Sequence, residues 1–182
     1  MSLNPIRQKQ LQQFIQKLGL PDRVPVRWEL LDLALTDSTA SSEANYERLE
    51  FVGDAVIKLT SAEFLFEQYP QLSEGELSAI RSILVSDRIL SEIASSYGFD
   101  RYLVLGGSAQ GDTTGRDTRL AAAFEAVLAV LYLSTHTLQL IRPWLDAHLE
   151  QKTELIRLDP TLQNYKGALQ TWTQAHYHML PE

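Results

Sequence analysis

Apolar residues recur at intervals of three and four along almost the whole chain, which is the repeat of amphipathic helices. The first such segment carries Leu11, Phe14, Ile15 and Leu18, and Gly19 closes it. Further helices are expected around residues 28–35, 46–69, 73–84, 87–97, 120–134 and 138–155. A chain of 182 residues is long enough for one sizeable core, so we expect an all-α protein.

Local signals add detail to three of these segments. Ser73 and Glu76 match the S-x-x-E capping box that begins a helix. Residues 64–66, Phe-Leu-Phe, suggest that much of the 46–69 helix is buried. Residues 106–118 are polar and contain four glycines, so we expect a flexible loop. A phosphate-binding loop is disfavoured there, because the G-K-[ST] ending is missing and no strand precedes the segment.

The composition bounds the compartment and the partners. No apolar run reaches the roughly 20 residues that cross a bilayer, and the N-terminal residues lack the apolar core of a secretory signal. The absence of cysteine fits a reducing compartment and excludes disulfides and thiolate chemistry. We therefore expect a cytoplasmic protein without a membrane partner.

The net charge of −7 argues weakly against a nucleic-acid partner, because phosphates call for Lys and Arg. The negative charge is unevenly distributed, however. Residues 47–76 contain seven acidic and two basic residues, a local balance of −5. A metal-dependent nuclease must carry anionic ligands, and a bound cation inverts the local field. The acidic balance is therefore compatible with nucleic-acid chemistry.

Three carboxylates lie in one short segment of the expected 46–69 helix. Glu47, Glu50 and Asp54 are spaced i, i+3 and i+7, so they share one helix face. Most acidic stripes of this kind are simply the solvated face of an amphipathic helix. Carboxylates packed so closely also repel one another unless they share a cation, and a divalent metal is the obvious candidate.

A fourth carboxylate is conspicuous because of its surroundings. Glu125 is the only charged residue in the apolar segment 120–134. A lone carboxylate in such a helix is costly to bury unless it is paired or bound to a metal. A salt bridge to a nearby arginine and a metal site both remain open on this reasoning.

The segment from Asn45 to Val56, Asn-Tyr-Glu-Arg-Leu-Glu-Phe-Val-Gly-Asp-Ala-Val, closely resembles the N-x-E-R-L-E-F-[LV]-G-D-A-V signature of the ribonuclease III family. The resemblance covers roughly residues 5–155. It implies that residues 1–157 form an all-helical ribonuclease III endonuclease domain that works as a homodimer. It further implies a metal-dependent endoribonuclease that cleaves double-stranded or hairpin RNA and leaves 5'-phosphate and 3'-hydroxyl ends.

The family's functional residues can be carried over to the matching positions. Glu50, Asp54 and Glu125 resemble the metal-binding acids, and Asp54 and Glu125 the catalytic ones. Glu47 is expected to act behind the ligands or at the substrate, and so is Glu74 in a weaker match. The implied cofactor is Mg²⁺, for which Mn²⁺ can substitute. The implied partners are double-stranded RNA and a second copy of the chain.

Phe51 lies beside the acids but points in a different direction around the helix. The resemblance suggests that Phe51 packs into the partner subunit, whereas an ordinary core position would explain an aromatic residue equally well. Asp37 stands where the family often has His, and we expect it to affect only local packing. The four histidines are too scattered for a metal site.

The chain departs from the family at Ala122, where the related enzymes usually carry a metal-binding Asp. Asp117 cannot replace it, because it would lie about 140° away on an extended helix. We expect weaker metal binding and reduced activity, although water can fill a vacated position on Mg²⁺. Two alternatives to a competent nuclease follow: a dimer that binds structured RNA but is impaired in cleavage, and an interaction module on ribosome precursors.

The C-terminal residues form the second departure. Residues 158–182 resemble a linker and the first helix of a double-stranded-RNA-binding domain. Such a short segment cannot supply the remaining helix and the three strands of that domain. We therefore expect it to be only the beginning of an RNA-binding domain.

Overall fold

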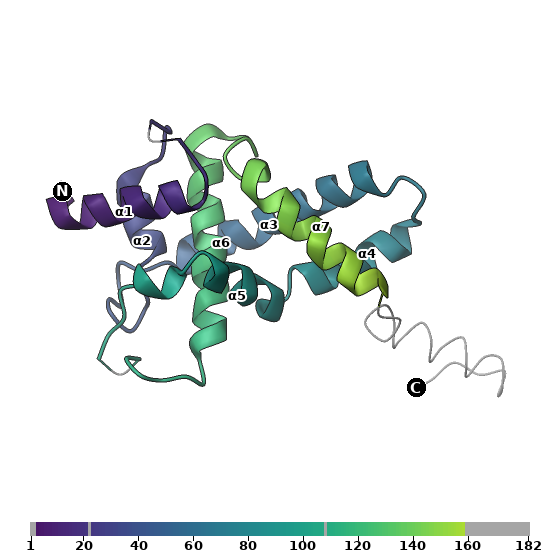
Figure 1. Cartoon of the computed structure of the whole chain (residues 1–182). Coiled ribbons are helices and arrows are strands. Elements are labelled where there is room, and N and C mark those ends of the chain that lie inside the picture. Colours follow the sequence, from purple (N-terminus) through teal and green to yellow (C-terminus); the bar gives the residue numbers. More distant parts are fainter. Residues whose placement is uncertain (1–2, 22, 108, 159–182) are drawn as a thin grey trace.

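The computed structural model describes residues 3–21, 23–107 and 109–158, so the expected RNA-binding helix lies outside the described residues. The described part is helical, and the prediction of an all-α fold is confirmed. The elements are α1 (Pro5–Lys17), α2 (Trp28–Ala34), α3 (Glu47–Gln68), α4 (Glu74–Leu84), α5 (Asp87–Ser96), the short 3₁₀ helix η1 (Phe99–Arg101), α6 (Arg116–Thr135) and α7 (Arg142–Leu158). Figure 1 shows their arrangement around α6.

The core forms around α6, which runs through the centre of the fold (Figure 1). Its buried side chains include Leu120, Phe124 and every residue from Ala126 to Leu131. The helix is long and apolar enough to cross a membrane by length and composition alone. Most of it is buried against α3, α5 and α2, so the protein core accounts for its apolar character.

The sequence signals for helix ends are largely reproduced. Gly19 and Gly98 follow α1 and α5 with positive φ angles of 76° and 70°, a conformation that glycine adopts without strain. Ser73 and Glu76 form the complete capping box at the start of α4. Two unsatisfied backbone N–H groups are thereby paired, which fixes where α4 begins.

The polar loop is shorter than predicted, because α6 begins at Arg116 rather than near residue 120. Arg116 donates to the Asp100 carboxylate at 2.6 Å and to the Ser95 hydroxyl at 3.2 Å, which ties the first turn of α6 to α5 and η1. Arg119 also pairs with Asp112 at 3.0 Å. These long-range contacts stabilise an extra helical turn that local composition does not indicate.

The burial predicted for the aromatic segment of α3 was partly wrong. Phe64 and Leu65 are buried, but the side chain of Phe66 is 74% exposed. The reason is the helical repeat: each residue is turned about 100° from the one before it, so three consecutive residues cannot all face the core.

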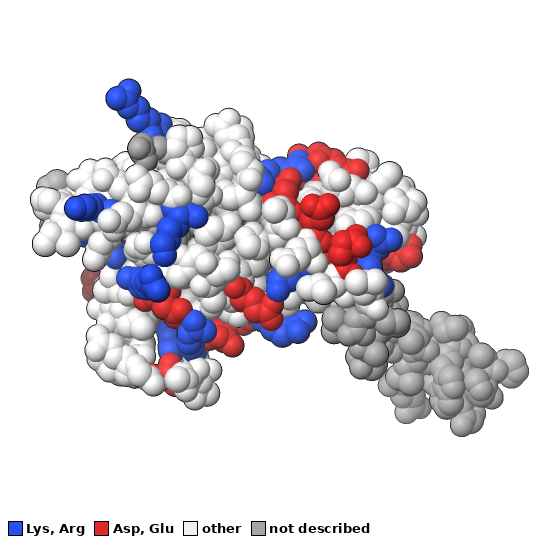
Figure 2. All heavy atoms as spheres, in the orientation of Figure 1, with Lys and Arg blue, Asp and Glu red and all other residues white. Residues whose placement is uncertain are grey.

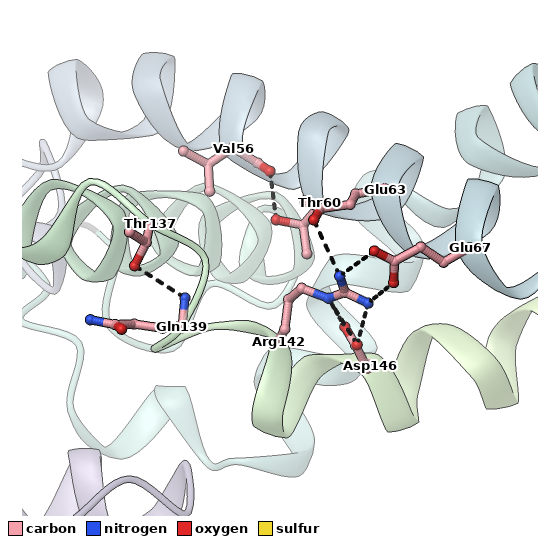
Figure 3. Close-up of polar contacts among 8 residues, drawn as sticks. All are labelled: Val56, Thr60, Glu63, Glu67, Thr137, Gln139, Arg142 and Asp146. Carbon is pink, nitrogen blue, oxygen red and sulfur yellow. Dashed lines mark hydrogen bonds and ion pairs between the residues drawn. The ribbon is translucent and has the colours of Figure 1, made fainter.

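Helix α7 is tied to α3 by an ion-pair cluster around Arg142 (Figure 3). The guanidinium lies 3.3 Å from the Glu63 carboxylate, 2.6 Å from Glu67 and 3.0 Å from Asp146. Glu63 and Glu67 belong to α3, whereas Asp146 lies one turn along α7 and orients the guanidinium, so two ion pairs join α7 to the C-terminal half of α3.

Candidate active site

The backbones of α3 and α6 approach each other closely at Gly53 and Glu125. A Cβ atom added to Gly53 would overlap the backbone carbonyl of Glu125. The glycine therefore lets the two helix backbones touch. Glu50 and Asp54 lie on either side of Gly53 in the chain, so this approach brings the predicted α3 acids next to Glu125. A glycine in the middle of a helix indicates a close approach of another backbone, but this contact was not among the predictions from the sequence.

The charges around Glu50 are those of other carboxylates. Burial raises the pKa of Glu50, and the negative charges of Glu47, Asp87 and Asp54 raise it further. Glu50 thus feels the charges of both other α3 acids, in agreement with their shared helix face. A fully solvated acidic stripe would not show this combination of burial and mutual repulsion.

Glu125 is perturbed more strongly. Burial raises its pKa to about 7, together with the charges of Asp54, Glu50 and Asp87, and the nearby ammonium of Lys58 lowers it only in part. None of the described residues forms a salt bridge with Glu125, so the arginine partner considered from the sequence is not found there. A carboxyl group at this point binds a proton readily in the absence of another cation.

Asp87 is the acid that the sequence reasoning missed. It is the first residue of α5, and its charge acts on both Glu50 and Glu125. In sequence, an acid in the first turn of a helix is explained by the helix dipole alone. Only the packing of α5 against α6 places this carboxylate near the other four.

Asp54 has a partner in the described structure. The Lys58 ammonium lies 2.7 Å from one Asp54 oxygen and 2.8 Å from the other. The two residues are one helical turn apart on α3, and both side chains are about half exposed. This pair is the only salt bridge that the five acids make with described residues.

The remaining predicted positions differ in how they relate to this cluster. Glu74 lies at the start of α4, where it accepts a hydrogen bond from the Ser78 hydroxyl at 2.8 Å. It is not among the charges that act on Glu50. Ala122 is buried on α6, one turn before Glu125, and its side chain is 7% exposed. Asp117 does lie on the extended helix, but it is exposed and pairs with Arg116.

Asp37 organises the segment that leads into α3. Its buried carboxylate accepts hydrogen bonds from the Thr39 backbone N–H at 2.8 Å and from the Tyr46 hydroxyl at 2.7 Å. Burial raises the pKa of Asp37, but these hydrogen bonds and one from the Thr39 hydroxyl outweigh burial and hold it below its ordinary value. The expected local role is therefore carried out by hydrogen bonds that fix residues 37–46 ahead of the acidic helix.

Comparison with known proteins identifies the family. The pattern described as the ribonuclease III domain matches residues 47–136, from the first acid of α3 to the end of α6. A protein named Ribonuclease 3 2 from a Nostoc species is 58% identical over 98% of this chain and 74% of its own length. The chain belongs to the ribonuclease III family. Ribonuclease 3 2 from a Synechocystis species is 56% identical over the whole chain and 75% of its own length.

Solved ribonuclease III structures share the fold. The nuclease domain of ribonuclease III from Campylobacter jejuni, described with a flexible region involved in dimer formation, superposes with a TM-score of 0.62. It is 26% identical and covers 85% of this chain and 96% of its own. The likeness shows the nuclease-domain fold, and the family match and the named relatives make the protein a ribonuclease III-type endoribonuclease.

Ribonuclease III enzymes are generally metal-dependent, and the donor atoms at the crossing suit a hard cation. Carboxylate oxygens are what Mg²⁺ and Mn²⁺ prefer, and burial, followed by the charges of three other carboxylates, raises the pKa of Glu125. Within the part of the chain that the structure describes, however, no three acidic or histidine side chains already stand at metal-binding separation. The carboxylate donors are of the kind that binds such a cation, and one of them, Asp54, is paired with Lys58 instead.

Proposed function

We propose that this ribonuclease III is a Mg²⁺-dependent endoribonuclease that cleaves double-stranded or hairpin RNA and leaves 5'-phosphate and 3'-hydroxyl ends. The observation that carries the proposal is the convergence of Glu50, Asp54 and Glu125 at the point where α3 and α6 touch. Mn²⁺ can take the place of Mg²⁺, because both ions accept oxygen ligands. The proposed compartment is the cytoplasm.

The residues of the cluster have distinct roles in this proposal. Glu50, Asp54 and Glu125 would hold the metal ion, and Asp54 and Glu125 border the reacting phosphate. When bound, the ion lowers the pKa of a water molecule and neutralises charge on the phosphate. Asp87 acts on both Glu50 and Glu125, and Glu47 acts on Glu50, so their negative charges would strengthen the attraction of these acids for a cation. Glu74, outside the cluster, would contact RNA.

A homodimer is part of the proposal and is supported by exposed apolar residues on α3. The side chain of Phe51 is 82% exposed, which excludes the ordinary core position considered from the sequence. Leu59 and Phe66 are also exposed, and the helical repeat places all three within about 80° of one another. Such an apolar stripe beside the acids is suited to a second copy of the chain.

A second candidate function is favoured by Ala122. A methyl group there supplies no ligand, so the site has one carboxylate fewer than is usual in the family. A dimer that binds structured RNA and cleaves it poorly would follow if the remaining acids fail to hold the ion. Figure 2 shows Lys and Arg side chains over the α1 end of the molecule, where RNA phosphates could bind in either case.

The test compares cleavage of long double-stranded RNA by the parent protein, Glu125→Gln and Ala122→Asp, each in Mg²⁺ and in Mn²⁺. Cleavage by the parent that falls at least 100-fold in Glu125→Gln supports the enzyme, since such a change removes a ligand of the metal. Cleavage only after Ala122→Asp would favour the binding protein. Equal cleavage by the parent and Glu125→Gln would refute the assigned site.

A further inference from the structure

Among the residues that the structure describes, Lys58 is the one basic residue that contacts the acid cluster directly. Its ammonium bridges both oxygens of Asp54, at 2.7 and 2.8 Å, and its charge also acts on Glu125. Its direct contact is thus with α3 alone, and it acts on Glu125 of α6 through its charge. This geometry depends on the i, i+4 spacing of Asp54 and Lys58 on one helix.

The charge around this contact is negative overall. The cluster consists of five carboxylates, and one ammonium group is bonded to it. The ammonium supplies one positive charge where a divalent ion would supply two. It can therefore hold the Asp54 carboxylate in place, but it leaves Glu125 with a raised pKa.

The contact is also easily reversed. The Lys58 side chain is 52% exposed and that of Asp54 48%, so water can solvate both groups when they separate. Exposed pairs of this kind are held only weakly. The four-carbon stem of lysine lets the ammonium move several ångströms while its backbone stays within α3.

We propose that Lys58 is an internal counter-ion that occupies Asp54 in the metal-free protein and becomes a phosphate-binding residue when the metal takes Asp54. Both states use the same ammonium, directed first to a carboxylate and then to a phosphate oxygen of RNA beside the ion. Lys58 thus provides positive charge in a site where Ala122 supplies no metal ligand. This inference rests on the proposed function, because it requires a metal ion at Asp54.

The experiment measures Mn²⁺ binding by electron paramagnetic resonance for the parent, Lys58→Gln, Lys58→Arg, Lys9→Gln and Glu125→Gln proteins. Lys9 is an exposed residue of α1 and controls for the loss of one positive charge. We expect Lys58→Gln to bind Mn²⁺ about twofold to fivefold more tightly, because the competing ion pair is gone. Lys9→Gln and Lys58→Arg should bind like the parent.

Binding of a short RNA duplex is then measured in Ca²⁺, an ion that oxygen ligands also bind, and gels confirm that the RNA stays intact. Lys58→Gln should bind the duplex about tenfold more weakly, with a salt dependence lowered by about one phosphate contact. Lys58→Arg should retain the affinity of the parent. The difference should be smaller without divalent ions, since Lys58 then pairs with Asp54.

The outcomes separate the two proposals. If the parent binds Mn²⁺ and Glu125→Gln loses it, while Lys58→Gln matches the parent in both assays, the role of Lys58 is refuted and the metal site stands. If neither the parent nor Lys58→Gln binds Mn²⁺, the metal site itself is refuted, and the role of Lys58 with it. Tighter Mn²⁺ binding together with weaker RNA binding, seen only in Lys58→Gln, would support the inference.

Discussion

Replacing Gly53 by alanine tests whether the active site depends on backbone contact between α3 and α6. The added methyl group would overlap the Glu125 carbonyl, and a backbone group cannot rotate aside as a side chain can. Overpacking a well-filled interior typically costs about 1–3 kcal/mol, and this contact belongs at the upper end of that range. Alanine recovers about 1 kcal/mol through its better helix propensity. We therefore expect Gly53→Ala to lower the free energy of unfolding by about 2 kcal/mol.

Gly75 provides the matched control. It lies in the first turn of α4, and a Cβ atom added there would meet nothing within 4 Å. Gly75→Ala should leave the protein as stable as the parent, or more stable by up to about 1 kcal/mol. Urea denaturation followed by circular dichroism measures both variants. If Gly53→Ala were as stable as Gly75→Ala, the close approach of α3 and α6 would be wrong.

Three further changes test other parts of the structure. The pKa of Glu125 is raised to about 7 in the folded state, so the folded protein binds a proton at Glu125 more tightly than the unfolded chain does. The contribution of Glu125 to the stability of the metal-free protein should therefore fall as the pH rises from about 4.5 to 7. Glu125→Gln should remove that loss. In urea titrations, the variant should be more stable than the parent by about 1–2 kcal/mol at pH 8, a value that is discounted for solvent screening. At pH 4 the two proteins should be equally stable. Phe51→Ala should weaken a homodimer roughly 30-fold in analytical ultracentrifugation but leave monomer stability unchanged, and an unaltered dimer would refute the contact. Ser73→Ala should cost about 1 kcal/mol in thermal unfolding through loss of the α4 cap, whereas Ser82→Ala on the same helix should cost less.

Local chemistry predicted most helix ends, because those ends are determined by neighbouring residues. The Ser73 and Glu76 box and the positive φ of Gly98 depend on contacts within a few positions of the chain. The start of α6 could not be predicted in the same way. It depends on Arg116 reaching Asp100, 16 residues earlier, and such a pairing is visible only after α5 and α6 have packed.

In the acid cluster, too, some residues are predicted by local sequence and one depends on tertiary packing. The shared face of Glu47, Glu50 and Asp54 follows from helical geometry alone, and the apolar surroundings of Glu125 marked it as unusual. Asp87 carries no such mark in the sequence, because acids at helix starts are common. Its proximity to Glu50 and Glu125 arises from tertiary packing.

The same electrostatics gives Ala122 a physical consequence beyond the loss of a ligand. Ala122 is buried one helical turn before Glu125, whose pKa is already raised to about 7 by burial and three other carboxylates. Another carboxylate at position 122 would have to be desolvated beside them, and in the metal-free protein it would increase their repulsion. Alanine therefore avoids this repulsion, and Lys58 reduces it further by pairing with Asp54. If the acids bind a metal ion as we propose, both features favour stability without the ion over affinity for it, and these two positions set the balance.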